Sequence, residues 1–291
     1  LNYALIFGKF GFPELGFAGA AWGTVIATAI QCVVLLLFFL TGSRAAAFGT
    51  RRVRLDLPAT GQIIRYGGPT GLQIVFDLAS WGVAISWLVG WFGTAALAAT
   101  NIIVRYMHLS FMPPVGIGQV LQAMVGRAIG SGDKELATRH TALAMKVSGA
   151  YMGTAAILFV IFREPLLSIF VDAQEPLRDE IIRIGAGIMI IAAVFQFFDA
   201  MAIIYGNALR GAGDTIWPAV ATAICSIFIY ILGGMSLAYF VPSLGSAGPW
   251  LMGMTQIIIL GMALWLRWQF GPWRKIDIFA GSDKKLATEG T

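Results

Sequence analysis

The stretch IRIGAGIMIIAAVFQFFDAMAIIYG, residues 182–206, decides which kind of fold this chain adopts. As a helix it would be about 37 Å long at 1.5 Å per residue, which is enough to cross a hydrocarbon core of roughly 30 Å. A single acid, Asp199, lies deep among its apolar residues. Acids at membrane depth are costly and commonly mark an ion or substrate path, so Asp199 is the first candidate for a functional residue.

The composition of the whole chain agrees with a membrane location. Of its 291 residues, 58% are apolar and 12% are charged, and the mean hydropathy is +0.78. Soluble domains carry about 25% charged residues. Because lipid satisfies no backbone hydrogen bonds and the apolar runs are continuous, we predict an all-α integral membrane protein. The predicted transmembrane helices, about seven in all, cover residues 18–41, 67–91, 97–125, 140–162, 182–206, 216–240 and 249–270.

The basic residues predict the orientation of these helices. Most of the 20 Lys and Arg residues, Arg210 among them, fall in segments on one side of the predicted spans. Loops rich in Lys and Arg stay in the cytoplasm, so we expect a multi-pass protein of the cell membrane with a cytoplasmic C-terminus. The net charge of +5 then reports topology. A nucleic-acid partner is not predicted, since no basic patch is interleaved with aromatic residues.

A short motif occurs twice, each time before a span predicted to run from outside to inside. Residues 13–19 read PELGFAG and residues 242–248 read PSLGSAG. Internal repeats are the usual architecture of secondary transporters. Two complete copies would need twelve spans, so we expect this sequence to lack most of an N-terminal lobe. The predicted regions are 1–41 (outer loop and last helix of that lobe), 42–66 (cytoplasmic linker), 67–270 (six-helix C-terminal lobe) and 271–291 (disordered cytoplasmic tail).

A second motif, G-x-G-D, occupies two predicted cytoplasmic turns, at residues 130–133 and 211–214. Glycine ends a helix in left-handed geometry, and aspartate then caps the next helix. A phosphate-binding loop would need Lys followed by Ser or Thr, which neither motif has. The sequence holds no H-E-x-x-H, G-x-S-x-G or Walker A motif either, so we do not predict an enzyme.

Two deep acids, Asp77 and Asp199, each have a glutamine on their own helix face. Gln73 precedes Asp77 by four residues, and Gln196 precedes Asp199 by three, which are spacings that align side chains. The acids lie roughly 15 Å and 10 Å from the inner ends of their helices, so both can face one cavity. Carboxylate and amide oxygens suit Na⁺, another monovalent cation or a proton. The alternative is a pair of buried acids held by backbone groups or by Arg105.

Asn101, Arg105 and His108 share one face of another predicted span, at spacings of four and three residues. They are candidates for polar residues of the same cavity, with Arg105 as a counter-charge and His108 as a proton relay. The plainer interpretation makes Arg105 a structural neutraliser and His108 a polar residue with satisfied hydrogen bonds. No cofactor, and no metal other than Na⁺ at the two acids, is predicted.

Several stretches resemble the multidrug and toxic compound extrusion (MATE) transporters, in particular their NorM-like branch. Residues 11–24 (GFPELGFAGAAWGT) are similar to the entry to the family's sixth helix. Residues 110–133 (SFMPPVGIGQVLQAMVGRAIGSGD) resemble its eighth helix and the following turn, and residues 208–218 (ALRGAGDTIWP) resemble its turn between helices ten and eleven. The resemblance extends over nearly the whole chain, from Phe7 to Trp273.

The resemblance implies two six-helix lobes around a V-shaped cavity, and export of organic cations and other amphiphiles driven by inward Na⁺ or H⁺. It implies that Asp77, where the family often has Glu, and Asp199 form a cation site. Phe195 replaces an aromatic hydroxyl that can neighbour the second acid. The expected partners are membrane lipid and a small cationic or amphiphilic substrate, with a monomeric full-length protein.

Two other functions stay open at this point. A flippase for lipid-linked sugars from the same superfamily would favour a cavity rich in Arg and Lys for pyrophosphate, whereas only Arg105 lies deep in a predicted span. A non-transporting membrane scaffold or receptor would show no ion-dependent change in thermal stability.

Overall fold

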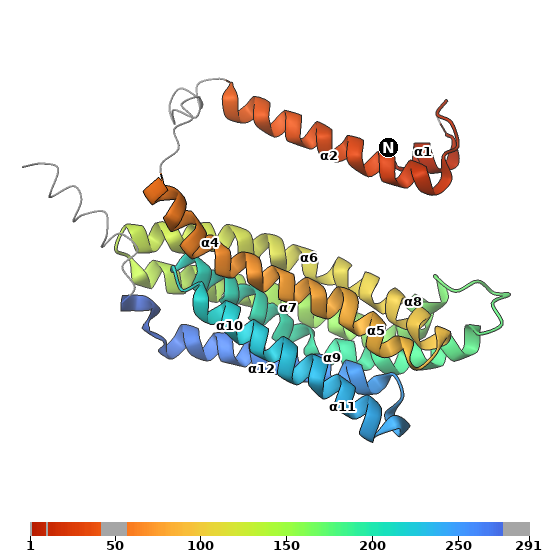
Figure 1. Cartoon of the computed structure of the whole chain (residues 1–291). Coiled ribbons are helices and arrows are strands. Elements are labelled where there is room, and N and C mark those ends of the chain that lie inside the picture. Colours follow the sequence, from red (N-terminus) through yellow and green to blue (C-terminus); the bar gives the residue numbers. More distant parts are fainter. Residues whose placement is uncertain (1, 10, 42–56, 276–291) are drawn as a thin grey trace, which may run out of the picture. The chain divides into compact units, whose positions relative to one another are not determined.

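The structure is a computed structural model that describes residues 2–9, 11–41 and 57–275 (Figure 1). The chain divides into two compact units, Leu1–Gly61 and Gln62–Thr291. The part of the chain that the structure describes is helical and contains no strand, which agrees with the predicted fold class.

The first unit consists of a short helix packed on a long one. Helix α1 (Asn2–Phe7) contacts α2 (Gly16–Leu40), and Gly19 makes this contact possible because an added Cβ would collide with the Leu5 carbonyl oxygen. Most side chains of α2 are apolar and exposed within the unit. The helix is long and apolar enough to cross a membrane.

The two copies of P-x-L-G-x-A-G have nearly the same φ angle at their central glycine. The φ angle is 53° at Gly16 and 54° at Gly245, a left-handed value that favours glycine. Each glycine lies at the start of a long apolar helix, α2 after the first copy and α12 (Ala247–Phe270) after the second. The local structures therefore support the repeat predicted from the sequence.

The second unit is a helical bundle (Figure 1). Two of its helices change to π-helical geometry over short segments, called η1 and η2, which contact each other. In chain order its elements are α4 (Leu57–Leu78), η1 (Ala79–Ala84), α5 (Ile85–Gly90), α6 (Thr94–Gly130), α7 (Lys134–Ile161), α8 (Arg163–Ser168), α9 (Arg178–Gly211), α10 (Ile216–Ile224), η2 (Cys225–Leu232), α11 (Gly233–Phe240), α12 and two 3₁₀ turns, η3 (Pro242–Leu244) and η4 (Pro272–Lys275).

Six helical segments among the described residues are long and apolar enough to cross a membrane. They correspond to six of the seven predicted spans. The seventh, residues 97–125, lies within α6, a helix of 37 residues that does not belong to that set. Its polar residues, including Asn101, Arg105 and His108, lower its apolar content although its length is sufficient. Helix α4 begins at Leu57, ten residues before the predicted start of its span.

Helix α9 is the central helix of the second unit. It contacts α6, α7, α8, α10 and α12, and its apolar residues contribute to both of the buried clusters of the unit. Small residues let its neighbours approach. An added Cβ at Gly118 of α6 would lie 2.5 Å from Nδ2 of Asn207, and one at Gly261 of α12 would lie 2.6 Å from the Phe198 carbonyl oxygen.

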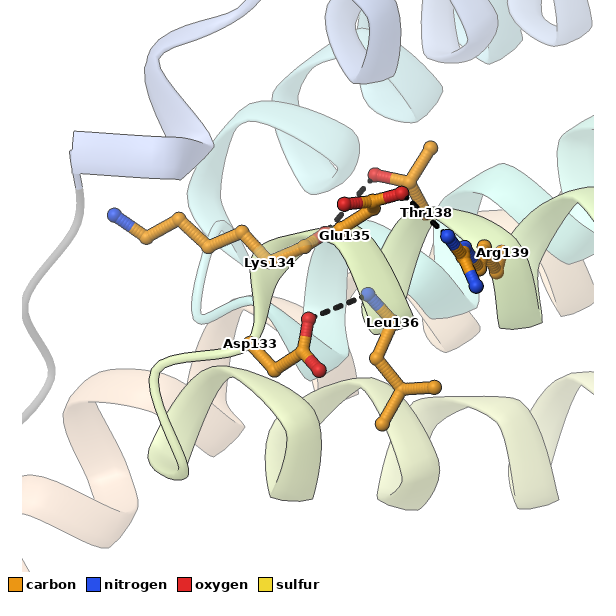
Figure 2. Close-up of polar contacts among 6 residues, drawn as sticks. All are labelled: Asp133, Lys134, Glu135, Leu136, Thr138 and Arg139. Atoms are coloured by element: carbon orange, nitrogen blue, oxygen red, sulfur yellow. Dashed lines mark hydrogen bonds and ion pairs between the residues drawn. The ribbon is translucent and has the colours of Figure 1, made fainter.

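The two G-x-G-D turns share a backbone but use their aspartates differently. Gly132 and Gly213 have φ angles of 82° and 84°, and the following aspartate N–H donates to a carbonyl five residues earlier in both turns, as in a Schellman motif. Oδ1 of Asp133 accepts from Leu136 N at 2.8 Å and caps α7 (Figure 2). The same prediction is wrong for Asp214, which pairs with Arg267 instead of capping α10.

The segment after α12 is folded as far as Lys275. Trp273 is buried, stacks on Trp268 with ring centroids 4.1 Å apart, and donates from Nε1 to the Trp268 carbonyl oxygen at 2.6 Å. Nζ of Lys134 donates to the Arg274 carbonyl oxygen. Residues 272–275 are therefore ordered, although we predicted a disordered tail. The two indole rings bury each other and hold this segment against α12. Residues 276–291 lie outside the described residues.

Candidate functional site

Helix α9 positions two of the predicted site residues. Asp199 is half-buried and Gln196, three residues earlier on the same face, is 1% exposed. The close approach of Gly261 to the Phe198 carbonyl places α12 beside this part of α9. Acidic residues at the first turn and Arg210 in the last turn of α9 suit the helix dipole. The acid is thus held on a rigid, packed helix and not on a loop.

Helix α4 supplies the other two predicted residues, Gln73 and Asp77. Gln73 is buried, and Asp77, one turn later, is half-buried. Nε2 of Gln73 donates to Oγ1 of Thr222 on α10 at 3.0 Å. Its Oε1 accepts a hydrogen bond from Nη1 of Arg210 at 2.9 Å. Both polar atoms of the amide are therefore engaged, and Gln73 connects α4 with α9 and α10.

Arg210 is the site residue that the sequence interpretation placed elsewhere. We predicted it in a cytoplasmic turn, but it lies in the last turn of α9 and is half-buried. Eleven residues separate it from Asp199, which is close to three helical turns, so both residues lie on similar faces of α9. That spacing was the signal that could have identified it. A Cβ on Gly206 would lie 3.9 Å from Nη2 of Arg210, so the guanidinium extends back along α9 toward Asp199.

The structure brings the two acids into one electrostatic cluster. The Asp77 carboxylate interacts electrostatically with Arg210 and with Asp199. When both acids are ionised, two negative charges and one guanidinium leave a single net negative charge. Such a charge among membrane-capable helices is unfavourable unless a cation or a proton compensates it.

Gln196 connects Asp199's helix to α6 and keeps one oxygen free. Its Nε2 donates to Oγ of Ser110 at 2.8 Å, and that hydroxyl donates to the Met107 carbonyl at 3.0 Å. Oε1 of Gln196 is buried and has no hydrogen-bond partner among the described residues. A buried amide oxygen without a partner is a suitable ligand for a monovalent cation or an ordered water.

Aromatic residues pack together one helical turn after Asp77 and one turn before Asp199. Trp81, one turn after Asp77, lies in η1 and stacks on Tyr230 with ring centroids 5.5 Å apart. It also packs against Phe195, one turn before Asp199, at 5.9 Å and against Trp250 at 6.2 Å. Phe195, Tyr230 and Trp250 are fully buried. These rings form a packed apolar cluster within one helical turn of each acid along α4–η1 and α9.

The MatE family matches residues 72–235 of this chain, which is more than half of its length. The chain belongs to the MatE family. It is 30% identical over 274 residues to the multidrug resistance protein NorM of Burkholderia vietnamiensis, and the match covers 93% of this chain and 57% of that protein. It is 32% identical over 280 residues to a NorM protein of Thermotoga maritima, and the match covers 94% of this chain and 58% of that protein. The chain thus spans a little over half the length of these relatives.

Solved MATE transporters share the fold. The structure aligns with a mutant of the Vibrio cholerae MATE transporter VcmN with a TM-score of 0.73 at 20% identity, covering 96% of this chain and 60% of that one. It aligns with the eukaryotic MATE transporter AtDTX14 with a TM-score of 0.78 at 18% identity, and the alignment covers 94% of this chain and 59% of that one. The all-helical fold of this MatE chain is therefore that of about half a MATE transporter.

Asn101, Arg105 and His108 lie on one exposed face of α6 in this MatE protein. Nδ1 of His108 lies 2.8 Å from the Val104 carbonyl oxygen, so its own helix satisfies one ring nitrogen. Within the part of the chain that the structure describes, Arg105 forms no ion pair with an acid. The structure thus joins Asp77 with Asp199 and Arg210, and leaves this face of α6 as a separate predicted element of the cavity.

Proposed function

We propose that this MatE chain forms the ion-coupled part of a membrane exporter of small cationic or amphiphilic molecules. Asp77 and Asp199 are the residues that would bind the coupling ion, Na⁺ or H⁺. The observation that supports this proposal most directly is their electrostatic cluster with Arg210 among membrane-capable helices. The NorM names of the relatives agree with drug export.

The charge of the cluster suggests how an ion could drive transport. One monovalent cation or one proton would neutralise the single net negative charge of two ionised acids and Arg210. The conformations of the transporter would differ in their affinity for the ion. An ion shifts the equilibrium between two conformations only through such a difference in affinity. We propose that ion binding from outside favours release of the substrate and that ion release to the cytoplasm resets the transporter.

The remaining features of the proposal concern the protein as a whole. Residues 67–270 would act as a C-terminal lobe together with an N-terminal lobe of the same transporter, since the relatives are longer and the P-x-L-G-x-A-G repeat relates two halves. The transporter would be a monomer in the cell membrane with its C-terminus in the cytoplasm, in agreement with the distribution of Lys and Arg. Its partners would be lipid and the exported molecule, without catalysis and without a cofactor.

Binding of radioactive sodium to the purified chain in detergent, repeated at several proton concentrations, tests the site directly. Saturable binding that protons displace is expected, and Asp77→Asn and Asp199→Asn should each weaken it at least tenfold. Glu175→Gln is the matched control because it removes an exposed acid from a loop. Efflux of a fluorescent organic cation by cells that express each variant within a transporter that includes the N-terminal lobe then tests transport. Unchanged ion binding and efflux in both aspartate variants would refute the proposed site.

The same measurements separate the two alternatives. A lipid-linked sugar flippase would not remove a fluorescent organic cation from cells. A scaffold or receptor would show neither ion-dependent thermal stability nor efflux.

A further inference from the structure

We propose that the Arg210 guanidinium is a tethered cation that competes with the coupling ion for Asp77 and Gln73. This inference rests on the proposed function and adds the residue that controls ion affinity and release. It makes Arg210 a positioning residue and not a ligand of the ion.

Arg210 of α9 contacts helix α4. Its Nη1 donates to Oε1 of Gln73 at 2.9 Å, and its charge interacts with the Asp77 carboxylate one turn farther along α4. Guanidinium has five N–H donors in a planar arrangement, so it can serve an amide oxygen and a carboxylate together. In this structure Arg210 therefore occupies the Gln73 oxygen that we predicted as an ion ligand, and its charge acts on the Asp77 carboxylate without a direct ion pair among the described residues.

The coupling ion and the Arg210 guanidinium would place two positive charges beside the same residues, Gln73 and Asp77. Na⁺ needs several oxygen ligands, and a bound Na⁺ close to Arg210 would place two like charges near each other in a poorly screened environment. The Gln73 oxygen has two lone pairs, so the competition arises from the repulsion between the two cations and not from a lack of acceptor capacity. Ion binding therefore weakens the contact between Arg210 and Gln73, and that contact weakens ion binding.

The Arg210 side chain also has a second favourable position. It lies in the last turn of α9, next to the Gly211–Gly213 turn, where a cation interacts favourably with the carbonyl end of the helix. The side chain can swing from Gln73 toward this helix end when an ion takes its place.

The consequence is a site that does not trap its ion. With Arg210 on α4, the acids keep a compensating charge when no ion is bound, so ion release does not leave two unpaired carboxylates. The cost of expelling the guanidinium lowers ion affinity, and its return accelerates release. The affinity of the site is then set by Arg210, although Arg210 does not touch the ion.

Measurements of ion affinity and of ion exchange test this role on the purified chain. Arg210→Gln should lower the half-saturating concentration of the driving ion about tenfold, as removal of one nearby charge would, and slow ion dissociation similarly. Radioactive sodium reports Na⁺, and a pH indicator dye in weakly buffered detergent solution reports H⁺. Arg210→Lys keeps the charge and should bring both values back to within about threefold of the original protein.

Thr222→Val is the matched structural control. It removes the other hydrogen bond of Gln73 without removing a charge, so it should not tighten ion binding, whatever it does to the melting temperature. If Arg210→Gln leaves ion affinity unchanged or weaker, Arg210 is structural and the inference is wrong. If Asp77→Asn instead binds ions as the original protein does, the proposed function itself fails. The two failures are thus distinguished by different variants.

Discussion

Nε of Arg267 lies 2.8 Å from Oδ2 of Asp214, which joins the last turn of α12 to the turn before α10. The Asp214 side chain is only 6% exposed, and Arg267 also lies over the Trp217 ring, 5.3 Å from its centroid. The pair therefore fixes the same end of the bundle at which α9 ends and Arg210 lies.

Asp214→Ala should destabilise the protein more than loss of an exposed charge would. It leaves the partly buried guanidinium of Arg267 without its carboxylate, at a cost of about 2–3 kcal/mol. The melting temperature in detergent should fall clearly. Glu135→Ala, which breaks an exposed ion pair with Arg139 on α7 (Figure 2), is the control and should change it little. Equal effects of the two variants would contradict the assigned role of Asp214.

Asp133→Ala should have a smaller effect than Asp214→Ala. It removes the side-chain acceptor for Leu136 N at the start of α7, and loss of such a cap costs about 1 kcal/mol. Asp133→Asn retains an acceptor oxygen and should lie close to the original protein. Thermal unfolding by circular dichroism measures both, and an Asn variant as unstable as the Ala variant would argue against capping.

Gly261→Ala should disturb the site from outside it. The new Cβ would lie 2.6 Å from the Phe198 carbonyl oxygen, so α12 must move away from α9 next to Asp199. We expect weaker ion binding and a loss of about 1–3 kcal/mol from overpacking. Gly187→Ala on α9 is the control because nothing lies within 4 Å of its added Cβ. Sodium or proton binding by the Gly261 variant at the original affinity would show that the helix contact does not shape the site.

Gln196→Leu tests the free amide oxygen. The substitution removes Oε1, which has no partner among the described residues, and should weaken ion binding about tenfold, as loss of supporting ligands does. Ser110→Ala removes the hydroxyl that accepts from Nε2 of Gln196 but leaves Oε1, so it should weaken ion binding less. Equal ion affinity in the original protein and the Leu variant would remove Gln196 from the site.

Trp273→Ala should destabilise the end of the bundle at which α12 ends by about 3–5 kcal/mol, because it empties the space beside the buried Trp268 ring. Trp273→Phe keeps a ring for stacking and loses only the hydrogen bond to the Trp268 carbonyl, so a smaller effect is expected. Denaturation in detergent at increasing temperature compares the two. Similar stability of the Ala variant and the original protein would contradict this packing role.

The sequence was sufficient for the helices, and it also led to the proposal of the two acids. Continuous apolar runs specify helices in lipid, and an acid such as Asp199 stands out because few charges accompany it. The shared face of Gln73 and Asp77 also followed from helical spacing, since that geometry is local. The φ angles of 53° at Gly16 and 54° at Gly245 agree with the repeat that residue types alone had suggested.

The relations between helices could not be predicted in the same way. Arg210 looked like a loop residue because a G-x-G-D turn follows it at once, and only tertiary packing shows that it reaches Gln73. Asp133 and Asp214 occupy identical motif positions, but Arg267 is near only the second. The π-helical geometry that begins two residues after Asp77 lies where η1 contacts η2, and no local sequence pattern predicted it.

The central position of α9 has a mechanical consequence. Because α6, α7, α8, α10 and α12 all contact it, none of them can slide far by itself without losing its packing against α9. Under the proposed function, a change of charge at Asp199 acts on the helix that these neighbours share. The second unit should consequently tilt or turn as one body, with its internal geometry preserved, and flex mainly at its connections to the rest of the protein.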